Sequence, residues 1–476
     1  MVFSSSIFLF FFLPLVIIGY YLLKENYRVY FLMLASLFFY AWGEPKYVLI
    51  MLLSIIINYT FGLFIHTSIT SQRKIIAKVL LILAVACNLG ILFYFKYLDF
   101  SINTVNRVFK TGIALRNIVL PIGISFFTFQ GMSYVIDLYW QKVNVQKNPG
   151  LLAFYISFFP QLIAGPIVRY IDIEKQIYNR SESVEKFISG AQRFIVGLAK
   201  KLIIANNMGY VADLVFSNAA TENTAIVAWL GIISYTFQIY FDFSGYSDMA
   251  IGLGKMFGFE FLENFNYPYI SKTITEFWRR WHISLSSWFR DYLYIPLGGN
   301  RKGNVYANLI IVFALTGFWH GASFSFIVWG LWHGLFLIIE RLFNGREVKS
   351  KNFVPLRYVF TMLIVVIGWV FFRSPGLHYA LSYIGIMFGI IKPENVGFTT
   401  WYYFSPGTIF MMCLAILAST PVMKQLFGLF KARCFFCAEN AVSIKLVTSI
   451  ITLVLFFVCI VIVTSTSYNP FIYFRF

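Results

Sequence analysis

The stretch Gly317–Gly334 is GFWHGASFSFIVWGLWHG, and it contains the tripeptide WHG twice, around His320 and His333. Both copies lie in apolar runs, at 305–320 and 323–341. Ionisable side chains at membrane depth are costly and by default indicate a functional site. On one continuous helix the two imidazoles would lie about 20 Å apart. We therefore expect no shared metal ion; the two histidines have different roles, or one of them has none.

The composition is that of a protein with many membrane spans. Of the 476 residues, 59% are hydrophobic and 12% charged, and the mean hydropathy is +0.73. A helix needs about 20 apolar residues to cross a bilayer, and we count about eleven such spans. We predict an all-α polytopic membrane protein, with re-entrant or amphipathic segments. The absence of a dividing linker predicts a single membrane domain over 1–476.

The net charge of +18 would suggest nucleic acid in a soluble protein. In a membrane protein, basic residues gather in cytoplasmic loops and beside anionic headgroups. We expect the lipid bilayer as a partner and no nucleic acid. The basic surface could also attract an anionic substrate.

The segment 260–303 interrupts the apolar pattern. It reads EFLENFNYPYISKTITEFWRRWHISLSSWFRDYLYIPLGGNRKG. It is too polar to cross lipid as a simple helix and too aromatic for a solvated loop. An amphipathic or re-entrant segment packed on the bundle fits both properties. Thr273 or Thr275 can cap its helix, and Glu276 precedes Arg280 by four residues, the favourable order for a helical ion pair.

His320 is the strongest candidate for a general base. Gly317 and Gly321 flank it one turn apart, which lets a substrate or another backbone approach closely. Trp319 supplies a rigid wall. A desolvated imidazole stays neutral near pH 7, the state that a general base requires. The alternative is a neutral histidine that only bridges helices.

His282 is the second candidate, because three guanidiniums surround it in the sequence. Arg279 and Arg280 precede it and Arg290 follows. Such a cluster at a membrane surface is a suitable cradle for the phosphates of an anionic donor. Lipid headgroups would be bound by the same chemistry.

Two carboxylates in IYFDFSGYSDMAIG, Asp242 and Asp248, are the remaining polar candidates. Buried carboxylates at this spacing could pair with arginine. They could also form a proton or ion site, as in transporters.

Several long motifs resemble the membrane-bound O-acyltransferase family (MBOAT), in particular its bacterial branch with the membrane subunit of alginate O-acetylase. The signature is FWRRWHISLSSWFRDYLYIPLGG at 277–299 followed by TGFWHGASFSFIVWGLWHG at 316–334. Further matches are the opening MVFSSSIFLFFFLP, LPIGISFFTFQGMSYVIDLY at 120–139, FFPQLIAGPIVR at 158–169, YFDFSGYSDMAIGLGKMFGF at 240–259 and NPFIYFRF at 469–476.

The resemblance implies the MBOAT fold around a central tunnel, in the plasma membrane of a bacterium. His320 matches the family's near-invariant histidine, the catalytic base in the segment 305–341. His282 matches the family's second motif position, which is His or Asn, and would orient or polarise the donor carbonyl. His333 matches a repeat of the motif whose role stays open. Bulky rings at Trp319, Phe318 and Phe324 would admit only short acyl groups.

The resemblance also implies the substrates. The donor would be an acyl thioester on the cytoplasmic side, acetyl-CoA or an acyl carrier protein, with no tightly bound cofactor. The acceptor would be an exported polysaccharide or cell-wall glycan, reached directly or through an extracytoplasmic SGNH-type acetyltransferase. A D-alanyl transferase for teichoic acid, with a carrier-protein donor, is the near alternative. An ion-coupled transporter or exporter and a non-catalytic scaffold are the other classes.

Overall fold

The computed structural model describes residues 1–344, 354–394, 396, 398–426, 428, 440–466 and 468–472. These residues form helices and connecting segments and contain no β-strand, which confirms the predicted all-α class. Contacts group the chain into two compact units, Met1–Phe194 with Met249–Leu262, and Ile195–Asp248 with Glu263–Phe476. The single membrane domain over 1–476 stays a prediction.

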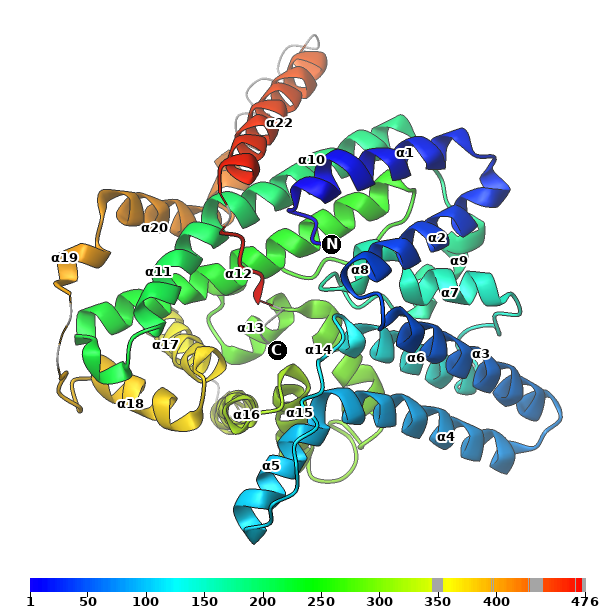
Figure 1. The fold of residues 1–476 in the computed structure, drawn as a ribbon, viewed down its shortest axis with the longest axis horizontal. Helices are drawn as coiled ribbons and strands as arrows, with labels where there is room; N and C mark the ends of the chain where they lie inside the picture. The colour runs from blue at the N-terminus through cyan, green and yellow to red at the C-terminus, as the bar shows by residue number, and fades with distance from the viewer. Residues whose placement is uncertain are drawn as a thin grey trace. The chain divides into compact units, whose positions relative to one another are not determined.

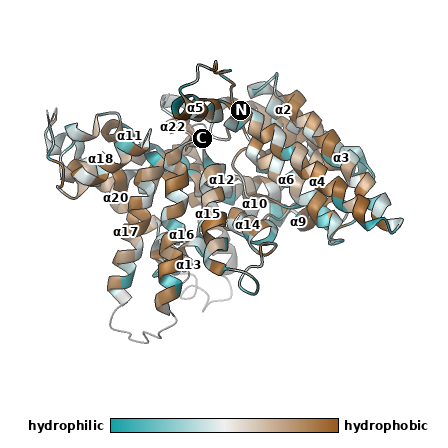
Figure 2. Cartoon of the chain, turned by 90° about the horizontal axis from the view of Figure 1, so that it is seen from below, coloured by the Kyte–Doolittle hydropathy of each residue, from teal (hydrophilic) through white to brown (hydrophobic). Residues whose placement is uncertain are grey.

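Six helical stretches of the described chain are long and apolar enough to cross a membrane: Val48–Thr70, Lys74–Phe109, Ala225–Met256, Phe324–Phe343, Pro355–Arg373 and Leu446–Ser465. Shorter apolar helices are Phe8–Leu22, Val305–His320, Leu377–Met387 and Pro406–Ala418. Figure 2 colours much of α3 (Val48–Thr70) and α4 (Lys74–Leu92) brown, which marks hydrophobic residues. The polytopic architecture is therefore confirmed, whereas the count of eleven spans stays a prediction.

The first unit contains the N-terminal helices (Figure 1). They are η1 (Phe8–Phe12), α1 (Leu13–Leu22), α2 (Glu25–Gly43), α3 (Val48–Thr70), α4 (Lys74–Leu92), η2 (Phe93–Tyr97), α5 (Leu98–Phe109), α6 (Ile124–Tyr139), α7 (Pro149–Ser157), α8 (Phe159–Leu162), α9 (Tyr170–Tyr178) and most of α10 (Val184–Ala199). Buried Asn58 of α3 and Asn88 of α4 exchange amide hydrogen bonds of 3.1 and 3.0 Å. Such pairing satisfies polar groups that lipid cannot, and it joins the two helices.

The second unit holds the predicted chemistry. It contains η3 (Lys200–Ala205), α11 (Asn206–Phe216), η4 (Ala220–Glu222), most of α12 (Ala225–Met256), η5 (Pro268–Ile270), α13 (Ile274–Arg280), α14 (Ile283–Phe289), η6 (Arg290–Tyr294), α15 (Val305–His320), α16 (Phe324–Asn344), α17 (Val354–Arg373), α18 (Leu377–Met387), α19 (Thr400–Tyr403), α20 (Pro406–Ala418) and α22 (Asn440–Ser465). The elements η3 and η6 are π-helices, a form common at functional sites.

Helices α15 and α16 form a tightly packed hairpin, close to the predicted runs 305–320 and 323–341. Asn304 caps α15 by accepting hydrogen bonds from the Tyr306 and Ala307 amides. Glycines at the crossing let the backbones meet: a Cβ on Gly317 would clash with the Phe326 carbonyl, and one on Gly330 with the Phe313 carbonyl. Gly317 therefore serves helix packing, one of the two functions that the sequence left open.

The Arg- and Trp-rich part of segment 260–303 folds as the short helices α13, α14 and η6. As predicted, Thr273 caps α13 by accepting a hydrogen bond of 3.0 Å from the Glu276 amide, and Glu276 pairs with Arg280 at 2.9 Å. The Glu340 carboxylate of α16 accepts from the Ile274 amide at 2.7 Å. A carboxylate at a helix N-terminus is stabilising, so this contact fastens α13 to α16.

Candidate active site

His320 is the last residue of α15 and is only 7% exposed. Its ring lies 4.9 Å from the Trp319 ring, 5.1 Å from Trp329 and 5.2 Å from Phe372, measured between ring centroids. The ring planes of His320 and Trp329 are nearly perpendicular, at 88°. Aromatic groups from three helices thus surround the imidazole and keep it out of bulk water.

A small cavity of about 10 Å³ adjoins His320. That volume suffices for roughly one water molecule. Its walls are otherwise apolar or aromatic: Ile239, Phe243, Trp281, Trp329, Trp369, Phe372 and Ile472. Phe318 and Phe324, which the sequence suggested as walls, do not line this cavity, and Phe324 is 50% exposed. Trp319, the third ring of that prediction, does not line this cavity either. The limit that these three rings would set on acyl length stays a prediction.

His333 lies close to His320, because the chain breaks after α15 and returns as α16. The rings of His320 and His333 lie 5.1 and 5.3 Å from the same Trp329 ring. The two imidazoles are therefore not separated by the ~20 Å that one continuous helix would impose. His333 is fully buried against Phe277 and Trp278, and no described residue bonds to either ring nitrogen.

His282 sits immediately before α14 with φ 44° and ψ 55°, in the left-handed region that is costly for a residue other than glycine. It is 1% exposed, and its Nδ1 lies 3.1 Å from Asn264 Oδ1. Burial, with a smaller contribution from nearby His320, lowers the pKa of His282 well below its usual value. The ring is therefore neutral near pH 7.

The structure brings the two predicted catalytic histidines to one tryptophan. The Trp319 ring lies 6.5 Å from the His282 ring and 4.9 Å from the His320 ring. The predicted tunnel around them stays a prediction.

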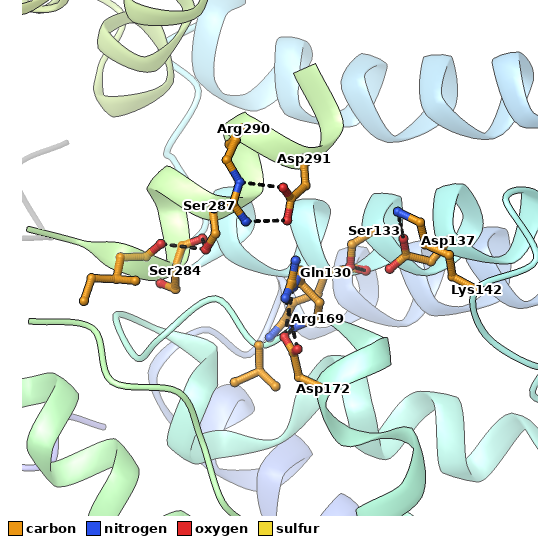
Figure 3. Close-up of polar contacts among 12 residues, drawn as sticks. Gln130, Ser133, Asp137, Lys142, Arg169, Asp172, Ser284, Ser287, Arg290 and Asp291 are labelled. Atoms are coloured by element: carbon orange, nitrogen blue, oxygen red, sulfur yellow. Dashed lines mark hydrogen bonds and ion pairs between the residues drawn. The ribbon is translucent and has the colours of Figure 1, made fainter. Parts of the chain in front are cut away.

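A second, much larger cavity of about 800 Å³ lies between α13, α14, α15 and α16. Arg279, Arg290 and Arg341 line it together with Glu340, so the lining carries more positive than negative charge. Arg290 is 61% exposed and makes two bonds to Asp291, at 2.7 and 3.1 Å (Figure 3). Arg280 does not line this cavity; it bonds to Glu276 and to the Asn266 carbonyl.

Two indole rings connect the cavities. Trp278 lines the larger one, Trp329 lines the smaller one, and the two ring centroids are 5.7 Å apart. A group that moves from the arginine-lined cavity to His320 along this line must displace or pass these rings.

Each of the two acidic candidates pairs with a lysine. Asp242 contacts Lys201 at 2.7 Å, and Asp248 contacts Lys200 at 2.6 Å. Asp242 also accepts a hydrogen bond of 2.9 Å from the Ile472 amide. The described part of the motif NPFIYFRF is thereby held beside the cavity of His320.

Sequence reasoning missed five residues of these sites: Lys200, Lys201, Asn264, Trp329 and Arg341. The adjacent lysines, preceding an apolar stretch, were a signal for Lys200 and Lys201. The others carried no distinguishing pattern.

A buried imidazole beside an apolar cavity, on a chain with many apolar helices, is an arrangement suited to acid–base chemistry inside a membrane protein. The sequence pattern of the membrane-bound O-acyltransferase family matches residues 30–372. The chain belongs to this family, as its motifs predicted. It is an O-acyltransferase and a multi-pass protein of the bacterial inner membrane.

Three similar proteins have names that refer to alginate, peptidoglycan and teichoic acid. A probable alginate O-acetylase of Pseudomonas putida is 42% identical over the full length of both chains. A peptidoglycan O-acetyltransferase of Helicobacter pylori is 39% identical over 82% of this chain and 80% of its own. A teichoic acid D-alanyltransferase of Bacillus subtilis is 31% identical over 54% of this chain and 67% of its own.

Proposed function

We propose that this protein transfers an acetyl group from a cytoplasmic thioester to an extracytoplasmic polysaccharide or cell-wall glycan. The observation that carries the proposal is His320, buried beside an apolar cavity at the end of α15. The names of the similar proteins, which refer to alginate and peptidoglycan, support a polysaccharide acceptor. Transfer either reaches the acceptor directly or passes through an SGNH-type acetyltransferase partner.

His320 serves as the general base. A hydroxyl of the acceptor attacks the thioester carbonyl, the new C–O bond forms, and the imidazole takes the hydroxyl proton. The C–S bond then breaks, and the imidazolium returns that proton to the departing thiolate. The aromatic walls limit water around His320, which protects the thioester from hydrolysis.

A separate group must donate a hydrogen bond to the carbonyl oxygen as it gains charge. His282 was predicted to polarise this carbonyl. Its Nδ1 already faces Asn264 Oδ1, so the neutral ring offers Nε2 as an acceptor. The Trp329 indole N–H is a donor on the cavity wall, and no described residue accepts from it. We assign the Trp329 N–H the role of donating a hydrogen bond to the carbonyl oxygen. We assign His282 the role of orienting an O–H or N–H group.

The larger cavity suits the anionic part of the donor. Both coenzyme A and the prosthetic group of an acyl carrier protein carry phosphate, which guanidinium groups bind strongly. Arg279, Arg290 and Arg341 line this cavity. Arg280 was grouped with them from the sequence, and its part in donor binding stays a prediction. The phosphates of lipid headgroups would compete for the same guanidinium groups.

Acetyl transfer is favoured over D-alanyl transfer, because the probable alginate O-acetylase is 42% identical over the whole chain, whereas the D-alanyltransferase is 31% identical over 54% of it. The transporter alternative loses support because Asp242 and Asp248 are both neutralised by lysines.

Sealed vesicles of known orientation test the proposal. An acetyl thioester labelled on its acetyl group and supplied on the cytoplasmic face should yield labelled acceptor on the opposite face, and the same donor on the outer face should not. Label that reaches the acceptor only from outer-face donor would overturn the proposed direction. Label that never reaches any hydroxyl acceptor would overturn acyl transfer.

A further inference from the structure

Asn264 connects two neighbouring segments of the second unit through one side chain. It is 1% exposed, and its Nδ2 donates to Ser247 Oγ at 3.1 Å. Its Oδ1 accepts from the Ser284 backbone amide at 3.2 Å and from Ser284 Oγ at 2.9 Å. Its backbone carbonyl also accepts from the Ile283 amide at 3.0 Å. The side chain is thus held by bonds at both ends of its amide.

These contacts determine which nitrogen of His282 carries a proton. The backbone N–H of Ser284 can only donate, so the Asn264 atom that faces it must be the oxygen. His282 Nδ1 lies 3.1 Å from that same oxygen. An oxygen acceptor requires a protonated nitrogen opposite it, and a neutral imidazole has one N–H. The proton therefore sits on Nδ1, and Nε2 carries a lone pair.

We propose that Asn264 is a positioning residue that fixes the Nδ1–H tautomer of His282 and so leaves Nε2 as the acceptor for a group in the reaction. This inference rests on the proposed function for the participation of His282. Asn264 also bonds both residues that follow His282, which supports its left-handed backbone. Nε2 is buried, and no described residue donates to it.

The groups around the His282 ring are mostly uncharged. Phe243 of α12 lies edge-on at 4.5 Å, and Phe265 and Trp319 lie at 6.5 Å. His320 of α15 is the titratable group that acts on it electrostatically. A carboxylate introduced at position 264 would therefore face the Nδ1–H of His282, and none of the contacting groups just named carries a negative charge.

The test compares Asn264→Ala, Asn264→Asp and the control Asn223→Ala in the full-length protein in nanodiscs. Asn223 is equally buried in the same unit, and in the described structure its side chain donates only to the Val215 and Ala219 carbonyls. The readouts are the ¹⁵N shifts of the His282 ring, assigned by comparison with His282→Gln, and steady-state acetyl transfer.

We expect wild type and Asn223→Ala to show the Nδ1–H tautomer alone. Asn264→Ala should show a mixture of tautomers and at least a tenfold lower kcat with KM within about twofold, since a well-placed base or acceptor contributes about 10²–10⁴-fold. Asn264→Asp keeps an oxygen acceptor and should restore the tautomer. It should also add an acidic limb to the pH profile, because a carboxylate favours the imidazolium.

An unchanged tautomer in Asn264→Ala would overturn the proposal. If that variant does not fold, an Asn264→Asp protein with the Nε2–H tautomer, or without a new acidic limb, overturns it equally. A changed tautomer with wild-type kcat would support positioning by Asn264 and contradict the role of His282 in the proposed function.

Discussion

Lys201 and Asp242 form an ion pair of 2.7 Å in which each side chain is only 2% exposed. Lys201 also donates to the Pro470 carbonyl, and Asp242 accepts from the Ile472 amide. Ile472 is one wall of the cavity at His320. The pair therefore holds a distant part of the chain against the candidate active site, and it is engaged in structure rather than in ion transport.

Replacing Lys201 with methionine should destabilise the protein. The change leaves a buried carboxylate without its counter-charge, which costs about 3–5 kcal/mol. Lys200→Met is the matched control, because Lys200 is 27% exposed and its pair with Asp248 is partly in solvent. Thermal unfolding in detergent should show a much larger loss for Lys201→Met. Equal Tm values for the two variants would contradict a structural role specific to Lys201.

Removing the charge of Arg279, Arg290 or Arg341 should weaken donor binding more than turnover. Loss of one hydrogen bond to a charged group costs at least about 1.4 kcal/mol, or roughly a tenfold rise in donor KM. The effect should shrink as salt rises. Arg107→Gln is the control, because Arg107 is exposed and lies in the other unit, away from this cavity's lining. Equal KM changes in all four glutamine variants would contradict a donor site in this cavity.

Trp329→Phe keeps an aromatic wall and removes the indole N–H. If that N–H stabilises the charged oxygen, kcat should fall by about 10²–10³-fold with little change in KM. Trp332→Phe serves as the control, because the Trp332 N–H is already bonded to the Ile364 carbonyl at 2.9 Å. Kinetics of the two purified variants decide the point: wild-type kcat in Trp329→Phe would exclude the assigned donor.

The buried His282 gives stability a defined pH dependence. Its pKa in the folded state lies well below the usual value near 6.5, chiefly because of burial. Below pH 6.5 the unfolded chain binds this proton and the folded protein does not, so the free energy of unfolding falls as the pH drops. Above pH 6.5 His282 is largely unprotonated in both the folded and the unfolded state, so it adds no pH dependence to the free energy of unfolding.

Unfolding of wild type and His282→Asn between pH 8 and pH 5 measures this contribution. The wild type should lose more stability than the variant below pH 6.5, and kcat should show no titration of His282 between pH 6.5 and 8. Parallel stability curves for the two proteins would indicate that the His282 pKa is not lowered.

Much of the fold was predictable because it follows from local composition. The apolar runs at 305–320 and 323–341 became α15 (Val305–His320) and α16 (Phe324–Asn344), since a glycine-containing break separates two runs of helical length. The Arg- and Trp-rich segment became short helices with the predicted Thr273 cap. Helix hairpins and helix caps are determined by residues that are close together in the chain, so they can be predicted from the sequence.

The surroundings of the site were less predictable, because they depend on contacts between distant residues. His320 and His282 could be singled out by residue type. Asn264 could not, because only its hydrogen bond to His282 connects it to the site. Trp329 is one of 11 tryptophans, and only the turn between α15 and α16 places it against both WHG histidines. The cysteines of the CxxC pair, Cys434 and Cys437, lie outside the described residues.

The most direct test of the account is acetyl transfer by purified His320→Ala and His320→Gln in proteoliposomes. The account predicts folded, membrane-inserted protein whose transfer does not exceed that of liposomes without enzyme. The control is Ala substitution of the half-buried His66, which lies in the other unit and should retain the wild-type rate. Wild-type yields of acetylated product from His320→Ala would contradict the role of His320 as the catalytic base.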